Sequence, residues 1–179
     1  MQTIVKTLIA VTLLAVWSCA SAPVERWRSE PATQTIGGPG LRAVLAPLKE
    51  SAEFYVGFRL TISNEGTTPL TLDWDQTRYL HNGRDLGVFV YQGIDPATIK
   101  GNIPAVVVPA GGTFTQDIFP LRTIAFLPGS QIPKEGRRGF IPGILPAGEN
   151  GILLVLDRDG QATRQKLSVR LRAETEPGK

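Results

Sequence analysis

The stretch FYVGFRLTISNEGTTPLTLDWD, residues 54–75, decides the fold class of this chain. Apolar and polar side chains alternate over residues 54–63 and again over residues 70–75. Successive side chains of a strand point to opposite faces, so each half presents one apolar face for burial. Residues 64–69, NEGTTP, carry a turn signal between the halves. We therefore predict two antiparallel strands joined by a hairpin or by a corner between sheets.

Further strands follow along the chain. Asn82-Gly83 favours a type I′ turn because both central residues of that turn need positive φ, and it joins residues 77–80 to residues 86–92. A last hairpin is predicted across Arg158-Asp159-Gly160. The other strand candidates and the arms of the last hairpin are residues 105–108, 113–119, 122–127, 151–157 and 162–173. Residues 95–100, which begin with Asp-Pro, are the one short helix candidate.

About eight short strands with turn signals between them favour an all-β, antiparallel β-sandwich of about 7–9 strands over residues 41–176. A small barrel is the alternative. Residues 128–146 contain four prolines and four glycines, and we predict a long irregular loop there.

The N-terminus is typical of a processing signal. Lys6 is followed by an uncharged apolar run, residues 7–16. As a helix these ten or so residues would measure about 15 Å, half of a hydrocarbon core of about 30 Å. The length fits a cleavable signal better than a permanent anchor, so residues 1–18 are predicted to be a signal peptide.

The run Val16-Trp17-Ser18-Cys19 resembles the lipobox of bacterial lipoproteins, with Trp17 as a bulky departure. The resemblance implies cleavage before Cys19 and acylation of its thiol, and Ala20 after it resembles the outer-membrane default. Cleavage after Ala20 or Ala22, or an uncleaved anchor, are alternatives.

Residues 19–40 lack periodicity and are rich in Pro, Gly, Ser and Thr. We predict a lipidated, flexible tether there, of which Trp27 is the one large apolar residue. Cys19 is the only cysteine, so an intrachain disulfide is impossible, and acylation would leave no thiolate for catalysis or metal binding.

Residues 60–75, together with Asn82-Gly83 and residues 108–114 (VPAGGTF), resemble small immunoglobulin-like lipoproteins of bacterial envelopes. The likeness covers roughly residues 54–126. It implies an Ig-like sandwich and an envelope location, and it implies no activity, because sandwiches carry many unrelated functions.

The charge distribution argues against nucleic-acid binding. The chain has 19 Lys and Arg against 16 Asp and Glu, and the longest basic run is Arg137-Arg138. A nucleic-acid groove needs clustered basic residues on one face. Arg137 and Arg138 instead suggest a contact with an acidic partner or phosphate groups, or simply a solvated loop.

Few residues suggest chemistry. Asp73 and Asp75 would share one face of a strand and could hold Ca²⁺ or act as an acid/base pair on sugars, but a solvated polar face is the simpler interpretation. His81, the only histidine, adjoins a turn. We identify no Gly-x-Ser-x-Gly elbow and no zinc-ligand set, so neither a catalytic triad nor a metal is expected.

These features lead to a functional hypothesis. We expect that the protein is not an enzyme and uses no cofactor. We expect a lipoprotein that is attached through Cys19, most simply to the outer membrane, where it faces the periplasm. It would act as a binding or accessory module for another envelope protein. Arg137, Arg138, Asp73 and Asp75 are the candidate partner surface. The alternative is a glycan-binding or glycan-processing protein that uses Asp73 and Asp75.

Overall fold

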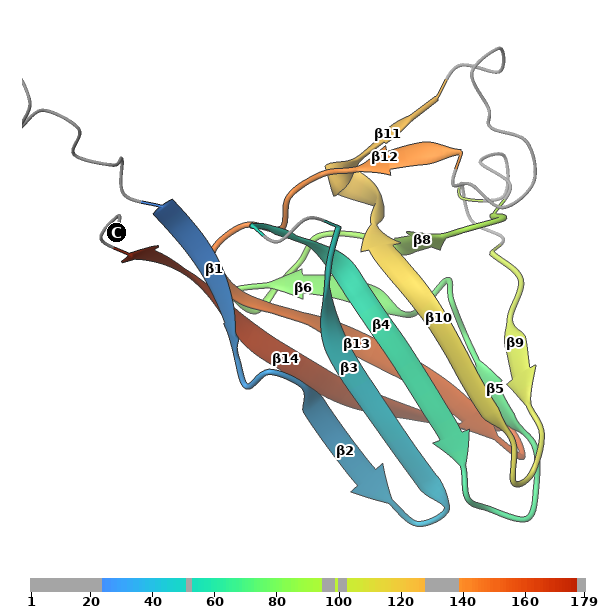
Figure 1. Ribbon diagram of the computed structural model, residues 1–179. Helices are drawn as coiled ribbons and strands as arrows, with labels where there is room; N and C mark the ends of the chain where they lie inside the picture. Colours follow the sequence, from blue (N-terminus) through green and yellow to red (C-terminus); the bar gives the residue numbers. More distant parts are fainter. Residues whose placement is uncertain (1–23, 51–52, 95–98, 100–102, 128–138, 177–179) are drawn as a thin grey trace, which may run out of the picture.

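The antiparallel sheets expected from the alternating pattern are present in the computed structural model, which describes residues 24–50, 53–94, 99, 103–127 and 139–176 (Figure 1). Every strand pairing among these residues is antiparallel, and no α-helix occurs in them. Two large sheets pack face to face, and a short two-stranded ribbon covers one end (Figure 1). The prediction of an all-β, antiparallel sandwich is confirmed.

The first sheet has seven strands. Its main path runs β1 (Val24–Glu30), β14 (Gln161–Glu176), β13 (Gly148–Arg158), β5 (Leu70–Leu72) and β9 (Val106–Val108). Beside this path, β6 (Arg78–His81) pairs with β13 and with β7 (Arg84–Asp85). The predicted last hairpin is confirmed: β13 and β14 pair around a turn at Asp159-Gly160, where φ is 54° and 79°. Asn82-Gly83, with φ of 48° and 76°, likewise forms the predicted tight turn, which joins β6 to β7. The predicted second arm over residues 86–92 is wrong, because residues 89–91 of it form a strand of the other sheet.

The second sheet has five strands. They are β2 (Gln34–Gly38), β3 (Leu41–Lys49), β4 (Tyr55–Asn64), β10 (Thr113–Pro120) and β8 (Phe89–Tyr91), in that order. The chain passes from β4 in this sheet to β5 in the other, so the deciding stretch forms a corner and not a hairpin.

The core lies between the two sheets. Phe58, Leu60 and Ile62 are the inward side chains of β4, as the alternation predicts, and all three are fully buried. Phe89 joins the layers, because its ring packs edge-on against Phe58 at 6.4 Å and Tyr79 at 5.8 Å between centroids. Edge-to-face aromatic pairs of this kind add to the burial of apolar area.

One buried polar residue fixes the corner between β4 and β5. The Asn64 side chain is 1% exposed, and its Nδ2 donates to the carbonyl oxygens of Thr68 and Val108, both at 2.9 Å. Its Oδ1 accepts from the Gly66 amide at 3.1 Å and from Arg158 Nη2 at 3.0 Å. Asn64 therefore ties the corner to β9 and to the end of β13.

The prediction of a flexible tether over residues 19–40 is wrong for residues 24–38, which form β1 and β2. β1 pairs with β14 over its whole length, and Trp27 packs edge-on against Phe54 at 6.2 Å. Lys49 Nζ also donates to the Trp27 carbonyl at 2.9 Å. Pairing with the distant β14 holds β1, and pairing with the neighbouring β3 holds β2, despite the Pro-rich and Gly-rich composition, so the folded domain includes residues 24–40 as well as residues from 41 onward.

The ribbon lies partly where a long irregular loop was predicted. A 3₁₀ turn, η2 (Leu121–Thr123), leads into β11 (Ile124–Phe126), which pairs with β12 (Phe140–Pro142). Phe140 packs edge-on against Phe119 at 5.4 Å and belongs to a second apolar cluster with Val56 and Val90. This packing orders residues 140–142, which corrects the loop prediction there. Apart from Ile99, the expected helix at residues 95–100 lies outside the described residues.

Candidate functional site

Asp73 and Asp75 do not share an exposed strand face, because β5 ends at Leu72 and the chain turns there. Asp73 Oδ1 accepts from the Gln76 amide at 3.0 Å, and Asp73 Oδ2 accepts from Gln76 Nε2 at 2.7 Å. Asp75 Oδ1 accepts from the Ile103 amide at 2.8 Å. Both carboxylates are half-buried and bonded within the domain, so the expectation of a solvated polar face is corrected to two structural hydrogen-bond acceptors.

Metal binding finds no further support in the described ranges, where no group of three or more His, Cys, Asp or Glu residues could hold an ion. Cys19, Arg137 and Arg138, the other residues singled out from the sequence, lie outside those ranges.

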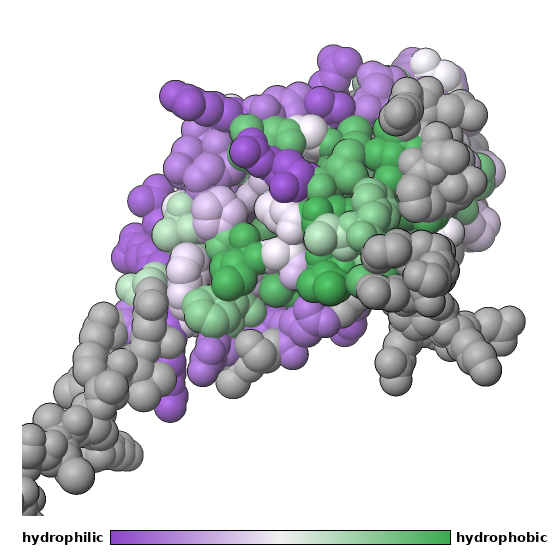
Figure 2. All heavy atoms as spheres, turned by 90° about the horizontal axis from the view of Figure 1, so that it is seen from above, coloured by the Kyte–Doolittle hydropathy of each residue, from purple (hydrophilic) through white to green (hydrophobic). Residues whose placement is uncertain are grey.

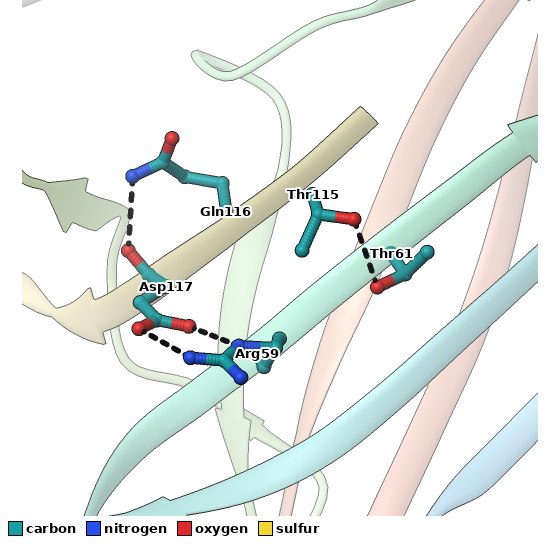
Figure 3. Close-up of polar contacts among 5 residues, drawn as sticks. All are labelled: Arg59, Thr61, Thr115, Gln116 and Asp117. Carbon is teal, nitrogen blue, oxygen red and sulfur yellow. Dashed lines mark hydrogen bonds and ion pairs between the residues drawn. The ribbon is translucent and has the colours of Figure 1, made fainter. Parts of the chain in front are cut away.

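The outer face of the five-stranded sheet carries a polar cluster that bonds within itself (Figure 3). Arg59 and Asp117, on β4 and β10, form a two-point ion pair with N···O distances of 2.7 and 3.0 Å. Beside them the hydroxyls of Thr61 and Thr115 lie 3.2 Å apart. Because these groups already pair with one another on an exposed surface, we regard the cluster as cross-strand stabilisation.

A pocket of about 350 Å³ opens at the end of the sandwich where β6, η2 and the approach to β13 meet. Its lining combines aromatic, basic, imidazole and apolar side chains. They are Tyr79, His81, Arg84, Leu86, Arg122, Thr123 and Pro146. These residues come from three segments that are far apart in the sequence, and no local sequence motif indicates that they meet. This pocket is the candidate functional site.

Tyr79 is the most buried part of the lining. Its hydroxyl donates to Asn150 Oδ1, and Asn150 Nδ2 in turn donates to the carbonyl oxygens of Pro146 and Gly148, at 2.8 and 3.1 Å. Burial raises the pKa of Tyr79 to about 12, and the positive charge of Arg122 partly opposes that rise. The phenol is therefore a protonated, fixed wall of the pocket at neutral pH.

Asn82 fixes the hydrogen-bonding state of His81. Asn82 Oδ1 accepts from the Glu149 amide at 2.9 Å, so its amide nitrogen is the group that faces His81 Nε2, at 3.0 Å. Nε2 then acts as the acceptor, which assigns the proton of the neutral ring to Nδ1. His81 Nδ1 is buried and has no hydrogen-bond partner in the described part of the chain. Such orphaned donors are uncommon in folded proteins.

Arg84 and Arg122 supply the positive charge of the pocket. Both are exposed, and neither forms an ion pair within the described ranges. The neighbouring acids have other partners: Asp85 pairs with Arg78 at 2.9 Å, and Glu149 with Lys166 at 2.7 Å. No acidic residue of the described part of the chain lines the pocket.

An apolar surface lies next to the pocket. We call it the ribbon surface, and it comprises Ile141 and Ile144, which are 58% and 51% exposed, together with Phe126, which is 41% exposed and packs on Phe140 at the opposite face of the ribbon. Arg122 and Thr123 of the pocket directly precede β11, and Pro146 closely follows Ile144. Figure 2 looks down on this end and shows hydrophobic residues gathered next to hydrophilic ones. Exposed apolar patches of this kind mark interaction sites more often than chance.

The opposite end holds a second pocket of about 330 Å³, beside Arg158. Arg158 Nη2 donates to the Gly40 carbonyl at 2.7 Å and to Asn64 Oδ1 at 3.0 Å. This arginine holds the β2–β3 turn against the β4–β5 corner, and its guanidinium is already engaged. We therefore assign it a structural role.

No protein-family model, curated protein or solved structure matches the chain. Within the described ranges, no helix has the length and apolarity needed to cross a bilayer.

Proposed function

We propose that this chain is a lipid-anchored, non-catalytic module of the bacterial cell envelope that binds another envelope protein through its ribbon surface. Acylation of Cys19 would attach it to a membrane, and Ala20 favours the outer membrane, facing the periplasm. The observation that carries the proposal is the ribbon surface itself, a group of exposed apolar side chains at the end of the sandwich where β1 begins (Figure 1).

The position of the first strand supports a close attachment. β1 begins at Val24, only five positions after Cys19. At about 3.3–3.6 Å per residue this link spans at most about 18 Å. β1 pairs with residues 170–176 of β14, at the end where β13 begins and the ribbon lies (Figure 1). A partner in the same membrane would thus be within reach.

The backbone of the ribbon favours a protein over lipid as the occupant. β11 and β12 pair with each other and with no other strand of the described residues. Open strand edges do not enter the hydrocarbon of a bilayer, because their amide and carbonyl groups would lose all partners. A partner protein can satisfy such an edge by adding a strand, while its apolar side chains cover the ribbon surface.

The alternative of a glycan-processing site rested on the expectation that Asp73 and Asp75 share one face of a strand, and β5 ends before both of them. Catalysis by a carboxyl pair needs two groups that face one cleft. Here Asp73 is bonded to Gln76 and Asp75 to the Ile103 amide, in a turn of the domain. Both acids have structural uses.

The anchor is tested by mass spectrometry of the mature N-terminus. We expect a diacylated or triacylated Cys19 in the wild type and an unprocessed, acyl-free precursor for Cys19→Ala. A free N-terminus at Ser21 in the wild type would show ordinary cleavage after Ala20 and would refute the anchor.

The docking surface is tested by photo-crosslinking in intact cells, with the reactive residue placed at Ile141. Val107 is the matched control, since it is an apolar strand residue, 61% exposed, on β9 outside the ribbon. We expect a discrete protein adduct from position 141 and none from position 107. Lipid adducts alone from position 141 would show that the ribbon contacts the membrane instead, and equal adducts from both positions would refute a specific surface.

A further inference from the structure

We propose that the pocket between β6–β7 and η2 binds an oxyanion, a phosphate or carboxylate group, held by Arg84 and Arg122. The pocket adjoins the ribbon surface and takes its biological role from the function proposed above, but its ligand chemistry can be tested without any partner protein.

The two arginines provide the recognition. Arg84 follows the Asn82-Gly83 turn and Arg122 lies in η2, so two separate elements bring them to one cavity. A guanidinium presents planar N–H donors that match the paired oxygens of a carboxylate or phosphate. Neither arginine forms an ion pair in the described part of the chain, and no acidic side chain lines the cavity. A ligand would therefore meet two uncompensated positive charges.

The nearest acids do not cancel this charge. Asp85, next to Arg84 in sequence, accepts from Arg78 Nε at 2.9 Å and from the Gly87 amide at 2.9 Å. Glu149 pairs with Lys166 on the neighbouring strand. Each acid is therefore paired with a base that does not line the cavity, and among the described lining residues the two arginines carry the only full charges.

The remaining walls are neutral and set the size of the ligand. Tyr79 and His81 form the polar wall, and Leu86 and Pro146 the apolar one. His81 meets Asn82 through Nε2, and its Nδ1 is buried, so we assign His81 no direct hydrogen bond to the ligand. A volume of about 350 Å³ lies at the small end for ligand sites. It fits one oxyanion group with a short organic remainder.

The test uses the full processed protein, purified in a neutral detergent and titrated with inorganic phosphate by calorimetry at low ionic strength. We expect one site per chain. Arg84→Gln and Arg122→Gln should each weaken it about tenfold or more, since each removes a charge-assisted contact, and the double variant should abolish it. Arg164→Gln is the matched control, because Arg164 is an exposed arginine on β14 away from the pocket. Thermal melts check that every variant folds.

Two competitors identify the source of the oxyanion. Displacement of phosphate by glycerol 3-phosphate points to a soluble ligand, and displacement only by phosphatidylglycerol in the micelles points to a lipid headgroup; either outcome supports an oxyanion site. The proposal would be overturned if phosphate alone, without a competitor, does not bind the wild type. It would also be overturned if the double variant binds phosphate as tightly as the wild type. Neither result depends on acylation of Cys19 or on crosslinking at Ile141, so the two proposals fail separately.

Discussion

Replacing Asn64 with alanine removes a buried hub at the β4–β5 corner. The side chain makes four hydrogen bonds, to the carbonyls of Thr68 and Val108, to the Gly66 amide and to Arg158. Alanine can replace none of them. The carbonyl of Val108 is the most costly loss, because its bond with Asn64 is buried on both sides.

The expected loss in free energy of unfolding for Asn64→Ala follows from these four hydrogen bonds. Each hydrogen bond contributes about 0.5–1.5 kcal/mol net, which gives about 2–6 kcal/mol for the set. Three of the four hydrogen bonds are only partly buried, so water can take the place of Asn64 in some of them. We therefore expect Asn64→Ala to lower the free energy of unfolding by about 3 kcal/mol. Against a total stability of about 5–15 kcal/mol this is a large fraction. For a domain of this size it lowers the melting temperature by about 6–12 °C.

The assay is thermal and urea denaturation of the purified protein, followed by circular dichroism. Gln161→Ala, which truncates an exposed side chain at the β13–β14 turn, is the control and should melt like the wild type. Asn64→Asp keeps the acceptor but turns a carboxylate toward two carbonyls, so it should be no more stable than Asn64→Ala. A melting temperature for Asn64→Ala within about 1 °C of the wild type would refute the reasoning.

Three further outcomes are expected. Trp74→Ala should lower the free energy of unfolding by about 3–5 kcal/mol, because its ring is buried against two aromatic side chains of the other sheet; an unchanged melt would contradict this packing. The pKa of Tyr79 is raised from 10.0 to about 12, so the folded state holds this proton more tightly; its contribution is complete below about pH 10 and is lost as the pH rises through about 12. Tyr79→Phe should accordingly lose less stability over that alkaline range, and an identical loss would assign the titration to another group. Asp117→Asn should change stability by less than about 1 kcal/mol, because its ion pair with Arg59 is exposed; a loss of several kcal/mol would show that the pair is not merely a surface contact.

Local patterns predicted the parts of the fold that local physics determines. The alternation in β4 and the Asn82-Gly83 turn each express a constraint carried by a few neighbouring residues. β1, β2 and β3 were missed as strands. β1 is held by β14, far along the chain, and not by a strong apolar pattern of its own. β2 and β3 form a local hairpin across Pro39-Gly40, in a segment whose composition is typical of a linker. The segment around Trp27 looked like a linker until its pairing with β14 was known.

The candidate site was harder to predict for the same reason. Asp73 and Asp75 attracted attention because they are close in sequence, but a turn after Leu72 gives each a separate structural bond. Arg84 and Arg122 are 38 positions apart, and only the crossing of the chain between the sheets brings them to one cavity. A sequence pattern does not carry that information.

The pairing of β1 with β14 has a consequence for the order in which this protein can fold. β1 joins residues 24–30 to residues 170–176, so the loop that must close spans nearly the whole domain. Contacts of such high separation form late, whereas the β13–β14 hairpin closes over a two-residue turn and can form early. A chain that emerges with its N-terminus first must hold the segment around Trp27 unpaired until its last strand arrives. Loss of residues 170–176 would therefore leave β1, at the other end of the sequence, without its pairing partner.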